Sequence, residues 1–123
     1  MSAPDNARVA REVTEAFDKG DAAAIDRLLA DDVVWHEIGR AEPRAGKAAL
    51  REMAGGGDFT ITASTHDILA SDEHAIVLVN ATATRGGRTF SYRTAEIYHI
   101  RDGRITERWP FSDDTAAIAA FFR

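Results

Sequence analysis

The sequence contains no cysteine, only three prolines and 8% aromatic residues among its 123 positions. The absence of cysteine excludes disulfides, a thiolate nucleophile and cysteine-ligated zinc. Basic residues are outnumbered by acidic ones, 15 to 20, so the formal net charge is -5. That balance argues against the broad basic face which nucleic acids and anionic membranes require. We therefore expect neither a nucleic-acid nor a membrane partner.

Long apolar runs and the common motifs of cofactor and nucleophile sites are also missing. No run approaches the ~20 apolar residues that span a bilayer, and the chain does not begin like a secretory signal. GxGxxG, GxxxxGK[ST] and GxSxG do not occur, and no histidine pair has the spacing of a helical metal site. The sequence thus predicts no metal and no other cofactor. We expect a single domain over residues 1–123, located in the cytoplasm.

The hydrophobic pattern predicts two N-terminal helices followed mainly by strands. Apolar residues recur at helical spacing between Pro4 and Gly20, and Asp21 is placed to cap a second helix. Helices first and consecutive hairpins later favour an α+β fold with a mainly antiparallel sheet. The predicted strands cover residues 33–38, 59–70, 75–84, 88–100 and 105–111, and further helices are predicted over residues 47–53 and 115–122.

Acidic residues occur among apolar neighbours on these predicted strands. Because side chains alternate between the two faces of a strand, Glu37 shares a face with Trp35, and Glu96 shares one with Tyr92 and Tyr98. A carboxyl group held among apolar side chains resists ionisation and can exchange a proton near neutral pH. Glu37 and Glu96 are therefore candidate acid/base groups, as is Asp113, which follows the last predicted strand.

Each candidate acid also has a structural interpretation. Glu37 can pair with Arg40 or Arg44, and Glu96 can face solvent or pair with Arg93 or Arg108. Asp113 or Asp114 can cap the last helix, which is a common use of aspartate.

The register of two strands is left open by the sequence. A regular last strand turns Glu107 and Trp109 inward, whereas an irregular one turns Arg108 inward. His36 alternates away from Glu37 in a regular strand, and a bulge would bring it to the same wall.

Five segments and three single residues carry a family resemblance over nearly the whole chain. They are residues 20–25 (GDAAAI), 28–32 (LLADD), 42–52 (EPRAGKAALRE), 66–70 (HDILA) and 102–105 (DGRI), with Glu107, Trp109 and Asp113. Together they resemble the nuclear transport factor 2-like superfamily, particularly its SnoaL-like and ketosteroid-isomerase-like members. The resemblance implies a cone-shaped, curved antiparallel sheet closed by N-terminal helices around a pocket. It also implies a homodimer formed through the outer face of the sheet.

The same resemblance suggests roles for individual residues. It places Glu37 at the proton-transferring aspartate of ketosteroid isomerase and Glu96 at the protonated aspartate of its oxyanion hole. Val13 falls at or near the oxyanion-hole tyrosine and has no hydroxyl group. Asp113 resembles the acid/base aspartate of SnoaL-like cyclases. Limonene epoxide hydrolases use an Asp-Arg-Asp set, whose arginine would correspond to Arg93 or Arg108 here.

We therefore expect a cofactor-free enzyme that transfers a proton α to a carbonyl group of a small hydrophobic substrate. The alternatives are a module that binds a small hydrophobic molecule without chemistry, and a dimeric interaction domain. The residues expected to contact the substrate are Val13, Phe17, Trp35, His36, Tyr92, Tyr98 and Trp109.

Overall fold

The computed structural model describes residues 2–48 and 58–122, and it begins with two helices. α1 (Ala3–Lys19) starts after Ser2, whose hydroxyl accepts a hydrogen bond from the backbone N–H of Asp5. It ends at Gly20, which takes the left-handed conformation with φ 66°. α2 (Ala22–Leu28) is capped by the Asp21 side chain. Both helices begin where the sequence pattern predicts.

Six strands form one curved, unclosed sheet. They are β1 (Leu29–Trp35), β2 (Arg44–Ala45), β3 (Phe59–Ala70), β4 (His74–Arg85), β5 (Arg88–Arg101) and β6 (Arg104–Ser112), and the chain continues into α4 (Thr115–Phe121). The order across the sheet is β2-β1-β6-β5-β4-β3. All neighbouring strands are antiparallel except β1 and β6, which are parallel. The predicted α+β class with a mainly antiparallel sheet is confirmed, and the single parallel pair makes the sheet mixed.

The first strand differs most from its prediction. β1 begins at Leu29 rather than at residue 33, because Leu29 has extended backbone angles and pairs with Ile105 of β6. Arg44 and Ala45, which belong to no predicted helix or strand, pair with Trp35 and Val34 as β2. The predicted helix over residues 47–53 falls largely on residues 49–57, which lie outside the described part of the chain.

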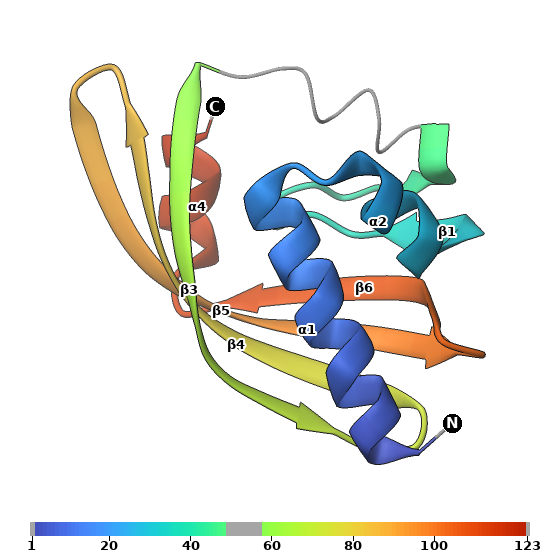
Figure 1. Ribbon diagram of the computed structural model, residues 1–123. Coiled ribbons are helices and arrows are strands. Elements are labelled where there is room, and N and C mark those ends of the chain that lie inside the picture. Colours follow the sequence, from blue (N-terminus) through green and yellow to red (C-terminus); the bar gives the residue numbers. More distant parts are fainter. Residues whose placement is uncertain (1, 49–57, 123) are drawn as a thin grey trace.

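The helices α1 and α4 lie on the concave side of the sheet, which we call the inner face (Figure 1). α1 contacts β3 and β4, and its buried side chains Val9 and Val13 join the core with Val77 of β4. Burial of this apolar surface stabilises the packing of helix on sheet. Within the described ranges, no helix has the length and apolar character needed to cross a bilayer.

A β-bulge in β6 decides which of its side chains reach the inner face. Ile100 of β5 pairs with Ile105, but the preceding His99 pairs with Glu107, so Thr106 is an extra residue. The side-chain alternation is therefore shifted by one position after Ile105. Arg108, whose cross-strand partner Tyr98 is buried on the inner face, is turned inward as a result.

Candidate functional site

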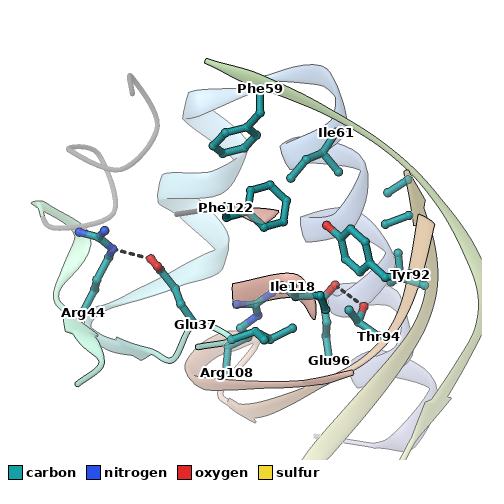
Figure 2. A pocket seen from close by; sticks show the side chains of 14 residues that line it. Glu37, Arg44, Phe59, Ile61, Tyr92, Thr94, Glu96, Arg108, Ile118 and Phe122 are labelled. Carbon is teal, nitrogen blue, oxygen red and sulfur yellow. Dashed lines mark hydrogen bonds and ion pairs between the residues drawn. The ribbon is translucent and has the colours of Figure 1, made fainter. Parts of the chain in front are cut away.

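A cavity of about 550 Å³ opens on the inner face between the sheet and α4 (Figure 2). Its volume lies in the range of small-molecule sites. Most of its wall is apolar, and the polar side chains are gathered on one side. The apolar and aromatic lining residues are Ile38, Phe59, Ile61, Ala63, Val79, Ala81, Tyr92, Ile118 and Phe122, and the other lining residues are Glu37, Arg44, Thr94, Glu96 and Arg108.

Glu96 of β5 and Arg108 of β6 form an ion pair in this cavity. Arg108 Nη2 donates a hydrogen bond of 2.8 Å to Glu96 Oε1, and the two side chains are only 15% and 19% exposed. Glu96 also accepts hydrogen bonds from the Tyr98 hydroxyl at 3.2 Å and the Thr94 hydroxyl at 3.3 Å. An ionised carboxylate is the form that accepts from three donors, one of them a cation.

Arg108 is held from several directions. Its Nη1 donates a 2.8 Å hydrogen bond to the backbone carbonyl of His36, and its guanidinium lies 4.7 Å from the centre of the Trp35 ring. Burial opposes the charge of Arg108, but the neighbouring Glu96 carboxylate, with Tyr98 and Glu37, outweighs it and raises the pKa of Arg108. The guanidinium is therefore a permanent positive charge in the cavity wall.

One donor of Arg108 has no partner. Its buried Nε atom makes no hydrogen bond within the described part of the chain. A buried donor without a partner is costly, and such a group often marks a functional site.

Glu37 and Arg44 form a second ion pair at the edge of the cavity (Figure 2). Glu37 follows β1 by two residues, and Arg44 lies opposite Trp35 in the β1–β2 register, so the two side chains meet from adjacent segments. Arg44 Nε lies 2.5 Å from Glu37 Oε1, and both side chains are about one quarter exposed, at 26% and 27%. Glu37 therefore pairs with a guanidinium, lines the cavity and remains partly accessible.

The two tyrosines of the wall are kept neutral. Burial, together with the adjacent Glu96 carboxylate, raises the pKa of Tyr98 far above its ordinary value, and the same causes raise the pKa of Tyr92. The Tyr98 hydroxyl is engaged with Glu96. The Tyr92 hydroxyl points into the cavity towards Phe122 (Figure 2), so it is the phenol that a ligand would meet.

A smaller hollow of about 280 Å³ lies under α1. It is lined by Phe17, Trp35 and Tyr98, which the sequence singled out as substrate contacts, and also by Glu37 and Glu96. Val13, another of those residues, is completely buried in the core and is not part of either wall.

Trp109 and His36 lie on the opposite, outer face of the sheet. The bulge at Thr106 turns Trp109 outward, where it stacks on His36 with ring centres 5.8 Å apart. His36 Nε2 lies 2.8 Å from an oxygen of Glu107, also on this face. The expectation that Trp109 and His36 line the cavity is thus corrected by the register of β6.

Asp113 is likewise outside the cavity. Its carboxylate accepts a hydrogen bond from the backbone N–H of Arg93 and lies 3.5 Å from the Arg93 side chain. The hydrogen bond from the Arg93 backbone lowers the pKa of Asp113 below its ordinary value. Asp113 is an exposed, ionised group, which is the opposite of the poorly hydrated acid that the sequence suggested. It does not cap α4 either, because that cap is Asp114.

The sequence interpretation did not include Arg44 and Arg108 among the functional residues. Arg44 appeared as a partner of Glu37, and Arg108 appeared as a partner of Glu96, as a residue that an irregular last strand turns inward and as one candidate for the arginine of an Asp-Arg-Asp set. The two pairings are the ones observed. A bulge signal in β6 would have identified Arg108, but residues 104–109 contain neither glycine nor proline to mark it. Within the described ranges, no group of three His, Asp or Glu side chains is placed to hold a metal ion.

Several solved structures have a fold similar to that of this chain. Among solved structures, Bal32a from a soil-derived mobile gene cassette is 28% identical, with a TM-score of 0.90 and 98% of each chain covered. An NTF2-like protein from Burkholderia pseudomallei is 20% identical, with a TM-score of 0.83 and coverage of 96% of this chain and 97% of that one. An LEH-like epoxide hydrolase from M. tuberculosis is 19% identical, with a TM-score of 0.75 and coverage of 90% and 84%.

At 20% and 19% identity, the last two comparisons show a shared fold and nothing more. A search of curated proteins found no match. The family model of the SnoaL-like domain matches residues 10–108, which is most of the sequence. The chain therefore belongs to the SnoaL-like domain family.

Proposed function

We propose that this protein catalyses proton transfer α to the carbonyl group of a small hydrophobic compound, without a cofactor. The observation that carries the proposal is the position of two Glu–Arg pairs, Glu37–Arg44 and Glu96–Arg108, in the wall of an otherwise apolar cavity. Apolar walls bind the body of the substrate, and the charged groups orient its carbonyl.

Glu37 is the base in this proposal. Its carboxylate removes a proton from the carbon next to the carbonyl, and the electron pair of that C–H bond moves onto the carbonyl oxygen to form an enolate. The protonated Glu37 then returns the proton to another carbon, which gives an isomer, or the enolate carbon attacks a second carbonyl of the same substrate, which closes a ring. In the second case the new alkoxide takes up the proton. The side chain suits this role because it lines the cavity, is partly accessible and lies beside the cationic Arg44.

Arg108 stabilises the developing negative charge on the enolate oxygen. It is a fixed cation in a cavity whose low polarity strengthens electrostatic interactions. Glu96 is then a positioning residue, because it holds the guanidinium and accepts from three donors. The resemblance to ketosteroid isomerase implied a different role, in which a protonated Glu96 donates a hydrogen bond to the enolate oxygen. In the present proposal Arg108 stabilises that oxygen instead.

The experiment follows α-proton exchange of 2-tetralone in D₂O by proton NMR. Glu37→Gln keeps the shape of the side chain but removes the base, and we expect exchange to slow by about 10²-fold or more. Glu42→Gln is the matched control, because Glu42 lies exposed in the same loop region. Exchange that is as fast in Glu37→Gln as in Glu42→Gln would exclude Glu37 as the base. Binding of 2-tetralone without any catalysed exchange would favour a ligand-binding module.

A second candidate reaction is the opening of an epoxide by water. It is favoured by the presence of two carboxylates, those of Glu37 and Glu96, and the Arg108 guanidinium in the wall of one cavity. Here Glu37 would take a proton from water, whose oxygen attacks an epoxide carbon as the C–O bond breaks. The alkoxide formed beside Arg108 would then take up the proton. Diol formation from limonene oxide, measured by gas chromatography, distinguishes this activity from ketone proton exchange.

We also propose that a second copy of the chain covers the outer face of the sheet. Cross-strand partners place two apolar rows there, Leu69–Ile76–Ile97–Trp109 and Leu78–Ala95–Phe111. Leu69 is 49% exposed and Phe111 57%. A continuous apolar patch of this kind is typical of an interface, and a two-fold axis would let it cover itself.

A further inference from the structure

The larger cavity and the smaller hollow under α1 share part of their walls. Five residues line both: Glu37, Ala63, Val79, Glu96 and Arg108. The two spaces therefore adjoin along the line where the acidic side chains and Arg108 gather. We call this line the junction, the larger space the main chamber and the smaller space the side chamber.

The two chambers differ in chemistry. Away from the junction, the main chamber is lined mainly by apolar and aromatic groups, including Phe59, Ile61, Ile118 and Phe122. The side chamber adds Thr14 and Asp18 from α1 and Thr65 from β3 to its three aromatic residues. A ligand that fills only the main chamber needs to be apolar, whereas a group that enters the side chamber meets hydroxyl and carboxylate oxygens.

The charge of the side chamber is negative. Its wall contains three carboxylates, those of Asp18, Glu37 and Glu96, and one guanidinium, that of Arg108. Because Glu96 is paired with Arg108 and Glu37 with Arg44, Asp18 carries the net negative charge of this wall. A ligand carboxylate would be repelled, while a hydroxyl group would find acceptors.

We propose that the substrate is bipartite: an apolar ring body occupies the main chamber, and a neutral, hydroxyl-bearing arm extends into the side chamber. The reacting carbonyl then lies at the junction, within the reach of Glu37 and Arg108. This inference rests on the proposed function for the position of the carbonyl. The division of the ligand between two chambers rests on the wall residues alone.

The fluorescence of Trp35 can be used to detect a ligand in the side chamber. It lines that chamber and not the main one, and the only other tryptophan, Trp109, lies on the outer face. The variant Trp109→Phe therefore leaves Trp35 as the single indole in the chain. Occupancy of the side chamber changes the surroundings of Trp35 and hence its fluorescence.

The experiment compares three probes in this Trp109→Phe background: 2-tetralone, 2-tetralone with a 6-(2-hydroxyethyl) arm, and 2-tetralone with a 6-carboxymethyl arm. We expect the hydroxyethyl arm to tighten binding about tenfold and to perturb Trp35 fluorescence, and the carboxymethyl arm to weaken binding. Thr65→Leu narrows the side chamber and removes a hydroxyl from its wall, so it should abolish the advantage of the hydroxyethyl arm. Thr62→Leu is the matched control, since Thr62 is on the same strand but lines an outer-face groove and neither chamber.

Equal binding of 2-tetralone and its hydroxyethyl derivative would overturn the inference, as would an unchanged advantage in Thr65→Leu. The proposed function survives those results if 2-tetralone still exchanges its α-protons. Conversely, tighter binding of the hydroxyethyl probe without any proton exchange supports the bipartite site and contradicts the proposed catalysis. Failure of all three probes to bind counts against both.

Discussion

Arg108 Nη2 donates to Glu96 Oε1 at 2.8 Å, so that adjacent strands β6 and β5 place a complete ion pair in the wall of the cavity. The pair meets because the bulge at Thr106 turns Arg108 to the inner face. The guanidinium also covers Trp35 and binds the His36 carbonyl. The pair therefore links β1, β5 and β6 at the place where the proposed chemistry occurs.

Arg108→Met should destabilise the protein by about 3 kcal/mol, because it leaves the largely buried Glu96 carboxylate without its cation. Urea unfolding followed by circular dichroism measures this change. Arg108→Lys should recover part of the stability, since it restores the charge but not the planar fork. Arg93→Met is the control: Arg93 pairs with Asp113 while 76% exposed, and its loss should cost less than about 1 kcal/mol. If Arg108→Met and Arg93→Met lowered the free energy of unfolding equally, the greater importance assigned to the Glu96–Arg108 pair would be contradicted.

The raised pKa values of Tyr98 and Tyr92 predict a pH dependence of stability at high pH. In the unfolded chain both phenols ionise near pH 10, but in the folded protein they remain protonated to higher pH. The folded state then binds more protons, so its stability is intact below about pH 10 and falls as the pH rises further. Tyr98→Phe should reduce this fall more than Tyr92→Phe, as measured by urea unfolding between pH 8 and 11. The prediction would be refuted if the free energy of unfolding fell equally steeply with pH in the wild type and in both tyrosine variants.

Asp113→Asn should leave α-proton exchange unchanged, because the carboxylate lies outside the cavity and contacts Arg93. Its lowered pKa instead predicts a small contribution to stability. This contribution is present above the ordinary aspartate pKa and is lost as the pH falls through the lower, folded-state value. Wild type and Asp113→Asn should therefore differ slightly in urea unfolding at pH 7 and converge near pH 2. Loss of exchange in Asp113→Asn would instead restore Asp113 as a catalytic candidate.

Phe111→Asp should dissociate the proposed homodimer, because it places a charge within one of the two apolar rows on the outer face, at its most exposed member. Sedimentation velocity of the wild type and the variant at several concentrations measures the change. Ile61→Asp is the control, since Ile61 is 48% exposed, comparable to the 57% of Phe111, but lines the inner cavity. A monomeric wild type, or equal effects of the two variants, would contradict an interface on the outer face.

Periodicity in the sequence was sufficient to predict most elements. The alternation in β3, β4 and β5 and the turns between them are local properties, so their predicted bounds match the observed strands within one or two residues. The same reasoning placed Glu96, Tyr92 and Tyr98 on one face, and all three line the chambers. The parallel pairing of β1 with β6 depends on contacts between segments that are distant in the sequence, so local patterns do not predict it.

Composition and short-range spacing are thus enough to predict the α+β class, the order of the elements and the concentration of acids among aromatic residues. Which acids face the cavity, and which cations accompany them, depends on the pairing of strands that are distant in the sequence. A single extra residue at Thr106 exchanges Trp109 for Arg108 in the cavity wall, because side chains alternate with a period of two. The placement of Asp113 beside Arg93 also depends on the pairing of β5 with β6, a long-range contact that fixes which face each residue occupies.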